Sequence, residues 1–169
     1  MRPIFLSLVC IFSSLAHADV VSVKDVSFLA VGPAGLKING VSTSLETKEE
    51  GEFVVIRVPL DTLETGISLR DRHMKEKYLE TQKFSHAELK VSKALLKAGR
   101  QQKGTGTFTV HGVSKPIDFV YDVTADANGL SVQGTFDINI KQFGIEVPSY
   151  LGVTVKPDVK VAANFVVKP

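Results

Sequence analysis

Apolar and polar residues alternate with a period of two along most of this 169-residue chain. The clearest example is the segment 130–141, in which every second residue is apolar or glycine and the residues between them are polar. Such alternation places one face of a strand against a core and the other in water, which is typical of half-buried antiparallel strands. Residues 117–124 and 159–167 repeat the pattern, so they are predicted strands as well.

Five weaker runs of the same kind lie at residues 21–31, 36–46, 52–60, 87–96 and 104–110. Turn-forming sequences separate most of these runs, for example Gly-Pro-Ala-Gly at 32–35 and Asp-Ala-Asn-Gly at 126–129. About eight strands with short connections predict one antiparallel all-β domain, either a barrel or a sandwich. A barrel of about eight strands is filled by its own side chains or holds one small ligand.

The segment 68–81, SLRDRHMKEKYLET, is helical in pattern and interrupts the series of strands. An apolar stripe recurs at spacings of four or five along it, and charged residues cover the remainder. The stripe consists of Leu69, His73, Met74, Tyr78 and Leu79. An amphipathic helix inserted between two strands is well placed to pack over one end of a barrel.

The start of this helix carries Arg70, Asp71 and His73, which together could suggest a catalytic cluster. Successive helix positions point about 100° apart, so these three side chains do not all converge. We interpret Arg70 and Asp71 as anchors, because Arg70 can donate to loop carbonyls and Asp71 lies where a helix N-terminus favours negative charge. Thr65 or Ser68 can cap the helix, and Ser68 with Asp71 approximates a capping box.

Residues 1–18 have the pattern of a cleaved signal peptide. Arg2 precedes an apolar run that ends near Leu15, and Ala16-His17-Ala18 is a small-x-small cleavage pattern. The run is too short to span a bilayer, which needs about 20 apolar residues. Cleavage would leave residues 19–169 as a single domain, and would remove Cys10, the one cysteine. We therefore expect a secreted, periplasmic protein without disulfides or stable membrane insertion.

Charge and motifs exclude several classes of function. The formal net charge is +2, and basic residues are interspersed with acidic ones, so nucleic acid is not an expected partner. The nucleotide-binding and nucleophile-elbow motifs are missing from the sequence. His73, His86 and His111 lack the spacing of a zinc site, and His111 fits a turn. We expect no metal, no cofactor and no enzymatic activity.

Three segments together resemble the YceI-like family of lipid- or polyisoprenoid-binding proteins. They are the helix and its sequel at 66–89, with Arg-Asp-x-His, the sequence GTFTVHGVSKP at 106–116, and FDINIKQFGI at 136–145. The resemblance covers residues 53–167. Two features differ from the family pattern: Ser85 stands where a proline is usual, and the N-terminal strands lack an early tryptophan.

The resemblance implies a lipocalin-like closed β-barrel of about eight strands with one helix inserted between strands. It also implies a periplasmic protein that sequesters or carries a long apolar lipid, such as a polyisoprenoid or a quinone-like molecule. The helix, with its Arg70, Asp71 and His73 signature, and the loop 143–152 would flank the entrance. Two alternatives remain: a filled barrel with a structural or stress-response role, and a metal-dependent enzyme that uses His73.

Large apolar residues at the alternating strand positions are the candidate lining of such a cavity. Each could instead fill the core, since interiors are closely packed. As a set they favour ligand binding, because an apolar cavity needs few polar groups to hold a chain. The candidates are Phe28, Ile38, Phe108, Phe119, Tyr121, Phe136, Ile138 and Phe165.

Overall fold

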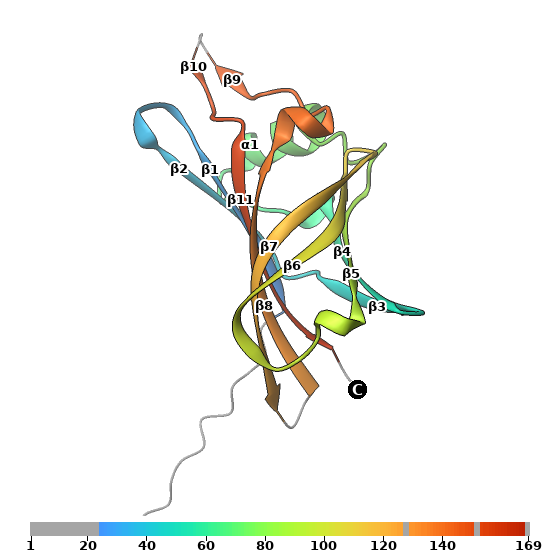
Figure 1. The fold of residues 1–169 in the computed structure, drawn as a ribbon. Coiled ribbons are helices and arrows are strands. Elements are labelled where there is room, and N and C mark those ends of the chain that lie inside the picture. Colours follow the sequence, from blue (N-terminus) through green and yellow to red (C-terminus); the bar gives the residue numbers. More distant parts are fainter. Residues whose placement is uncertain (1–23, 127–128, 151–152, 168–169) are drawn as a thin grey trace, which may run out of the picture.

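The computed structural model describes residues 24–126, 129–150 and 153–167, so the predicted leader at 1–18 lies outside it. In the described residues, nine strands form one antiparallel sheet that curls around a common core (Figure 1). In chain order these are β1 (Asp25–Val31), β2 (Lys37–Ser42), β3 (Glu46–Glu50), β4 (Phe53–Pro59), β5 (His86–Ser92), β6 (Gly99–Val110), β7 (Val113–Asp126), β8 (Gly129–Asn139) and β11 (Asp158–Val167). Their order in the sheet is β2-β1-β11-β8-β7-β6-β5-β4-β3.

The remaining elements lie in the connections. A two-stranded hairpin of β9 (Ser149–Tyr150) and β10 (Val153–Thr154) precedes β11. Short 3-10 turns are η1 (Pro33–Gly35), η2 (Leu60–Thr62), η4 (Lys93–Leu95) and η5 (Ile140–Phe143). The helix α1 (Ser68–His73) continues into a π-helical turn, η3 (Met74–Tyr78).

The predicted fold class, antiparallel all-β with one inserted helix, is confirmed, while the details of the strands differ. The main sheet has nine strands instead of about eight, because the predicted run at 36–46 stops at Ser42 and a further strand, β3, follows. The sequence of β3, ETKEE, has no apolar alternation that could reveal it. It is an edge strand, where charged side chains discourage pairing with other chains.

The two end strands of the curled sheet, β2 and β3, are not neighbours in its hydrogen-bonded order. Instead, the connection after β4 completes the wall by pairing with β2. Val41 and Glu64 exchange two backbone hydrogen bonds of 2.9 Å each, and the hydroxyls of Ser42 and Thr62 lie 2.6 Å apart. The closed barrel that we expected is therefore a curled sheet whose seam is held by a loop.

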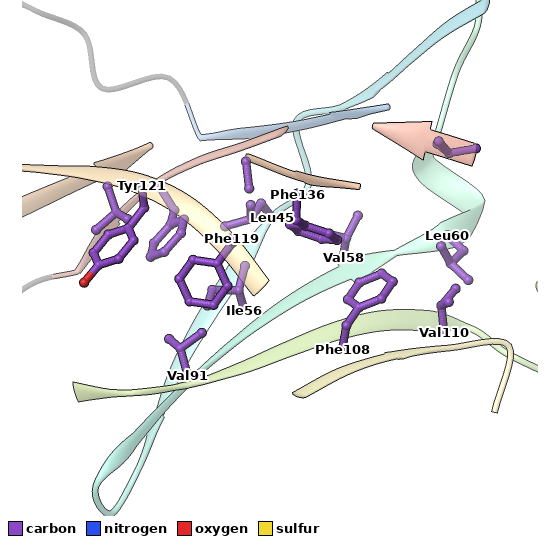
Figure 2. Packing of buried hydrophobic residues seen from close by; sticks show 14 of the residues in the cluster. Leu45, Ile56, Val58, Leu60, Val91, Phe108, Val110, Phe119, Tyr121 and Phe136 are labelled. Atoms are coloured by element: carbon purple, nitrogen blue, oxygen red, sulfur yellow. The ribbon is translucent and has the colours of Figure 1, made fainter. Parts of the chain in front are cut away.

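Inward-facing side chains of the strands form one apolar core (Figure 2). Aromatic pairs run along it: Phe108 contacts Phe136 and Phe143 edge-on, with ring centroids 5.1 and 5.6 Å apart. Phe119 contacts Tyr121 in the same way at 5.4 Å. Edge-to-face packing is the favoured arrangement of aromatic pairs, so the core has a defined packing along the sheet.

The turn between β6 and β7 consists of His111 and Gly112, both with positive φ, at 52° and 75°. A two-residue turn of this kind matches the twist of a hairpin, and glycine is the usual residue at its second position. The prediction that His111 opens a turn is confirmed. The ring of Phe84 lies against this turn, with its centroid 4.3 Å from that of His111.

Candidate functional site

An apolar cavity of about 760 Å³, partly open to solvent, lies inside the curled sheet. Inward-facing residues of seven strands of the main sheet line its wall, which explains why the alternating pattern recurs along the chain. Among them are Phe28, Ile38, Val58, Phe108, Ile138 and Val161. The volume is well within the range of about 300–1,000 Å³ that is typical of small-molecule sites.

The helix α1 and its π-helical continuation form part of the cavity wall at one end of the sheet (Figure 1). All five residues of the predicted apolar stripe line the cavity: Leu69, His73, Met74, Tyr78 and Leu79. The predicted helix at 68–81 is confirmed for 68–78, after which the backbone turns, with a φ of 46° at Glu80. The amphipathic pattern therefore predicted both the helix and the face that lines the cavity.

Two side chains at the start of α1 hold the preceding segment through Thr65. Asp71 accepts hydrogen bonds from the Thr65 backbone N–H at 2.8 Å and from the Thr65 hydroxyl. Arg70 donates from Nε to the Thr65 hydroxyl oxygen and from a terminal nitrogen to the Thr65 carbonyl, both at 2.7 Å. Arg70 thus donates to a loop carbonyl as the sequence suggested.

The predicted capping box is wrong. Ile67 occupies the N-cap position of α1, and no side chain caps the helix there. Asp71 accepts from Thr65 instead of bonding with Ser68 as a capping box requires, because the chain before α1 folds back across the helix start.

The three residues of the helix signature do not form one cluster. Arg70 and Asp71 meet at Thr65, whereas His73 is exposed and lines the cavity. Arg70 and Thr65 also line the cavity, so this end of the wall carries several polar side chains. The arrangement offers hydrogen-bond partners for a polar group at the end of a bound chain.

The other two histidines lie in different places. His111 Nε2 is 2.7 Å from Glu80 Oε2, so it joins the end of the helical segment to the β6–β7 turn. His86 Nδ1 is 2.7 Å from the Ser85 hydroxyl at the start of β5. Among the described residues, no three His, Cys, Asp or Glu side chains come together as metal ligands would.

A second, much smaller cavity of about 30 Å³ lies further along the core. Three predicted lining residues, Phe119, Tyr121 and Phe165, contact this space and not the larger cavity. The other five predicted residues, Phe28, Ile38, Phe108, Phe136 and Ile138, line the larger one, and Phe136 borders both. Burial raises the pKa of the Tyr121 hydroxyl, which donates to the Leu95 carbonyl at 3.0 Å.

Sequence reasoning missed two cavity residues in the connection after β4. Leu60 and Leu63, in the connection that completes the wall, are buried and line the cavity. Leu60 ends the predicted run at 52–60 but was not among the predicted lining residues, and Leu63 belongs to no periodic run. Ile145 and Pro148 also line it, as expected for a loop at 143–152 that flanks the entrance; residues 151 and 152 lie outside the described ranges.

A curled antiparallel sheet with an apolar interior cavity and a helix at one end defines a lipocalin-like class of β protein. Residues 15–167 match the model of the YceI-like domain. Because the match covers most of the sequence, the chain belongs to the YceI-like family. Within the described ranges, no helix has the length and apolar character that crossing a membrane requires.

Relatives and solved structures agree with this assignment. A UPF0312 protein of Pseudomonas savastanoi pv. phaseolicola is 30% identical over 122 residues, which is 66% of this chain and 62% of that protein. The chain thus matches less than two thirds of the length of this curated relative.

Two solved structures share the fold at low identity. A polyisoprenoid binding domain from Saccharophagus degradans, implicated in plant cell wall breakdown, has a TM-score of 0.68 at 17% identity, over 85% of this chain and 92% of that one. Burkholderia cenocepacia BcnA has a TM-score of 0.70 at 15% identity, over 86% of this chain and 96% of that one.

Proposed function

We propose that this protein binds one long apolar lipid, such as a polyisoprenoid or a quinone-like molecule, and sequesters or carries it. The observation that supports this most directly is the apolar cavity of about 760 Å³ inside the curled sheet. Natural apolar cavities of this size commonly serve ligands. The similarity of the fold to a polyisoprenoid binding domain supports the same ligand class.

The cavity volume sets the scale of the ligand. If a methylene takes about the same volume as a water in the liquid, about 30 Å³, the cavity of about 760 Å³ accommodates about 25 chain carbons. This corresponds to about five isoprene units. Burial contributes about 0.8 kcal/mol per methylene, so ten buried methylenes supply about 8 kcal/mol before the costs of association. Affinity therefore does not require polar chemistry.

The polar residues at the helix end support one orientation of the lipid. Thr65, Arg70 and His73 line the cavity where α1 begins, whereas the opposite end is bordered by apolar side chains such as Ile56 and Phe136. A polar head group at the helix end can exchange hydrogen bonds with these residues or with water. The apolar tail then extends into the core, and burying it there leaves no polar group of the lipid without a hydrogen bond.

A binding role fits the site better than either alternative. A filled structural barrel would have no cavity of this size between its strands. A metal-dependent enzyme would need several convergent ligands, and His73 lies apart from His86 and His111, which bond elsewhere. We infer that the protein works by excluding water from a lipid and not by catalysis.

Uptake of a long prenol, followed by native mass spectrometry, tests the proposal. Ala30 and Ala87 both line the cavity, so an Ala30→Trp/Ala87→Trp variant should fill part of it and lower occupancy at least tenfold. Ala162→Trp is the matched control, because Ala162 lies between two cavity-lining residues on β11 and points the other way. Equal uptake by the filled variant and the control, with both folded, would contradict the proposal.

We further propose that the protein acts in the periplasm after its leader is removed. The support is the signal-peptide pattern of residues 1–18. The intact mass of the protein from the periplasmic fraction of its own host should correspond to a chain that begins at Asp19. A full-length chain retained in the cytoplasm would contradict this.

A further inference from the structure

A thin apolar partition separates the larger cavity from the smaller one. Four residues border both spaces: Ile56, Leu89, Phe136 and Ala163. They come from β4, β5, β8 and β11, so the partition crosses the interior from one side of the curled sheet to the other. Phe136 contributes its largest side chain, and its ring packs edge-on against Phe108.

Figure 2 shows the order of these residues along the core. Ile56 and Phe136 lie between Phe119 and Tyr121 toward one end and Leu60 and Val110 toward the other. The first pair belongs to the wall of the smaller cavity and the second pair to that of the larger one. The two spaces are therefore successive sections of one tube, interrupted at Phe136.

Tyr121 borders the smaller cavity and is held by two contacts. The Tyr121 hydroxyl donates to the Leu95 carbonyl, and the Tyr121 ring packs against Phe119. The space of about 30 Å³ is large enough for about one methylene or water. Gly134 borders it, and a Cβ at that position would have only ordinary contacts, the nearest at 3.7 Å.

We propose that Phe136, with Ile56, Leu89 and Ala163, sets the maximum length of the chain that the cavity accepts. This inference rests on the proposed function, and it adds a specificity determinant to it. A lipid whose head lies near Thr65 and Arg70 places its tail end against this partition. A longer chain must displace the Phe136 ring or leave carbons in water, and each exposed methylene lowers the affinity several-fold.

The partition can be altered in both directions by single substitutions. Phe136→Ala removes the ring and joins the two spaces, which adds room for about one isoprene unit. Ala163→Phe adds a ring to the partition from the neighbouring strand β11, where Ala163 pairs with Gly134, and shortens the larger cavity. Ala162→Phe is the matched control, since it adds the same ring on the other face of β11.

Competition among linear prenols tests the inference. Each protein is incubated with a mixture of prenols that brackets roughly five isoprene units, and native mass spectrometry reads which lengths are bound. Relative to wild type, Phe136→Ala should shift the ratio of longer to shorter bound prenols upward by about tenfold, and Ala163→Phe should shift it downward. Ala162→Phe should leave the ratio unchanged.

The outcomes separate this inference from the proposed function. If wild type binds prenols, and Phe136→Ala and Ala163→Phe bind them with the same length preference as wild type, the length limit alone is overturned. Lack of binding at every length would overturn the proposed function and the length limit with it. If Phe136→Ala does not fold, Phe136→Leu removes the ring with a smaller loss of volume and should shift the ratio in the same direction.

Discussion

The hydrogen bonds between Asp71 and Thr65 give a quantitative prediction for the helix that borders the cavity. Replacing Asp71 with alanine removes a carboxylate that accepts from both the backbone N–H and the hydroxyl of Thr65. It also removes the carboxylate that shares the Thr65 hydroxyl with Arg70. The start of α1 should then lose its connection to the chain that precedes it.

The size of this loss follows from the number of bonds and their exposure. A hydrogen bond to a charged group contributes about 1.5–3 kcal/mol. Both Asp71 and Thr65 are half-buried, so water replaces part of what is lost. We therefore take the low end for two bonds and expect Asp71→Ala to lower the free energy of unfolding by about 2–3 kcal/mol.

Urea unfolding of Asp71→Ala and Thr65→Val, singly and together, measures this energy. The two single changes should not add, and a coupling of about 1 kcal/mol is expected because the residues share hydrogen bonds. Glu76→Ala is the control, since Glu76 is exposed on the same helical segment and should change stability by less than about 0.5 kcal/mol. An Asp71→Ala variant as stable as this control would refute the anchoring role.

Three further predictions concern glycine contacts and a buried tyrosine. A Cβ on Gly40 would lie 2.0 Å from the Phe28 ring, so Gly40→Ala should push that ring into the cavity. Urea unfolding should show a free energy of unfolding lower by about 1–3 kcal/mol, and unchanged stability would contradict this. Gly112→Ala puts an alanine at a φ of 75° and places its Cβ 2.7 Å from Phe84. The melting temperature of this variant should fall by several degrees, and a wild-type melting temperature would contradict the turn geometry. Burial raises the folded-state pKa of Tyr121 above its unfolded value of about 10. The stability that the neutral hydroxyl contributes is therefore fully present below about pH 10, and it is lost as the pH rises through the folded-state pKa. Unfolding at a series of alkaline pH values should show a shallower decline for Tyr121→Phe, and identical slopes would count against this.

Much of the fold could be predicted from the sequence because one face of each strand is buried. Alternation identified the strands around Phe136 and Phe165, and the stripe from Leu69 to Leu79 identified the helix face on the cavity. The edge strand Glu46–Glu50 was not predicted because both of its faces are polar. The seam between Val41 and Glu64 was not predicted because it pairs a strand with a loop, and a loop has no periodicity.

The candidate site was only partly predictable, for a related reason. Phe136 and Phe119 occupy equivalent alternating positions, so nothing in the pattern shows that one borders the larger cavity and the other only the smaller one. The volume itself depends on small residues such as Ala30 and Ala163, which line the cavity from the paired strands β1 and β11. That information appears only when the register of the sheet is known.

The most direct test of lipid binding is native mass spectrometry of the protein purified from its own host, followed by extraction of any bound molecule. We predict a mass shift from one bound lipid with a chain of about 25 carbons. Denaturing the protein in organic solvent should release this lipid into the extract. A clean apo mass, together with no uptake when prenols or quinones are titrated in, would contradict the account.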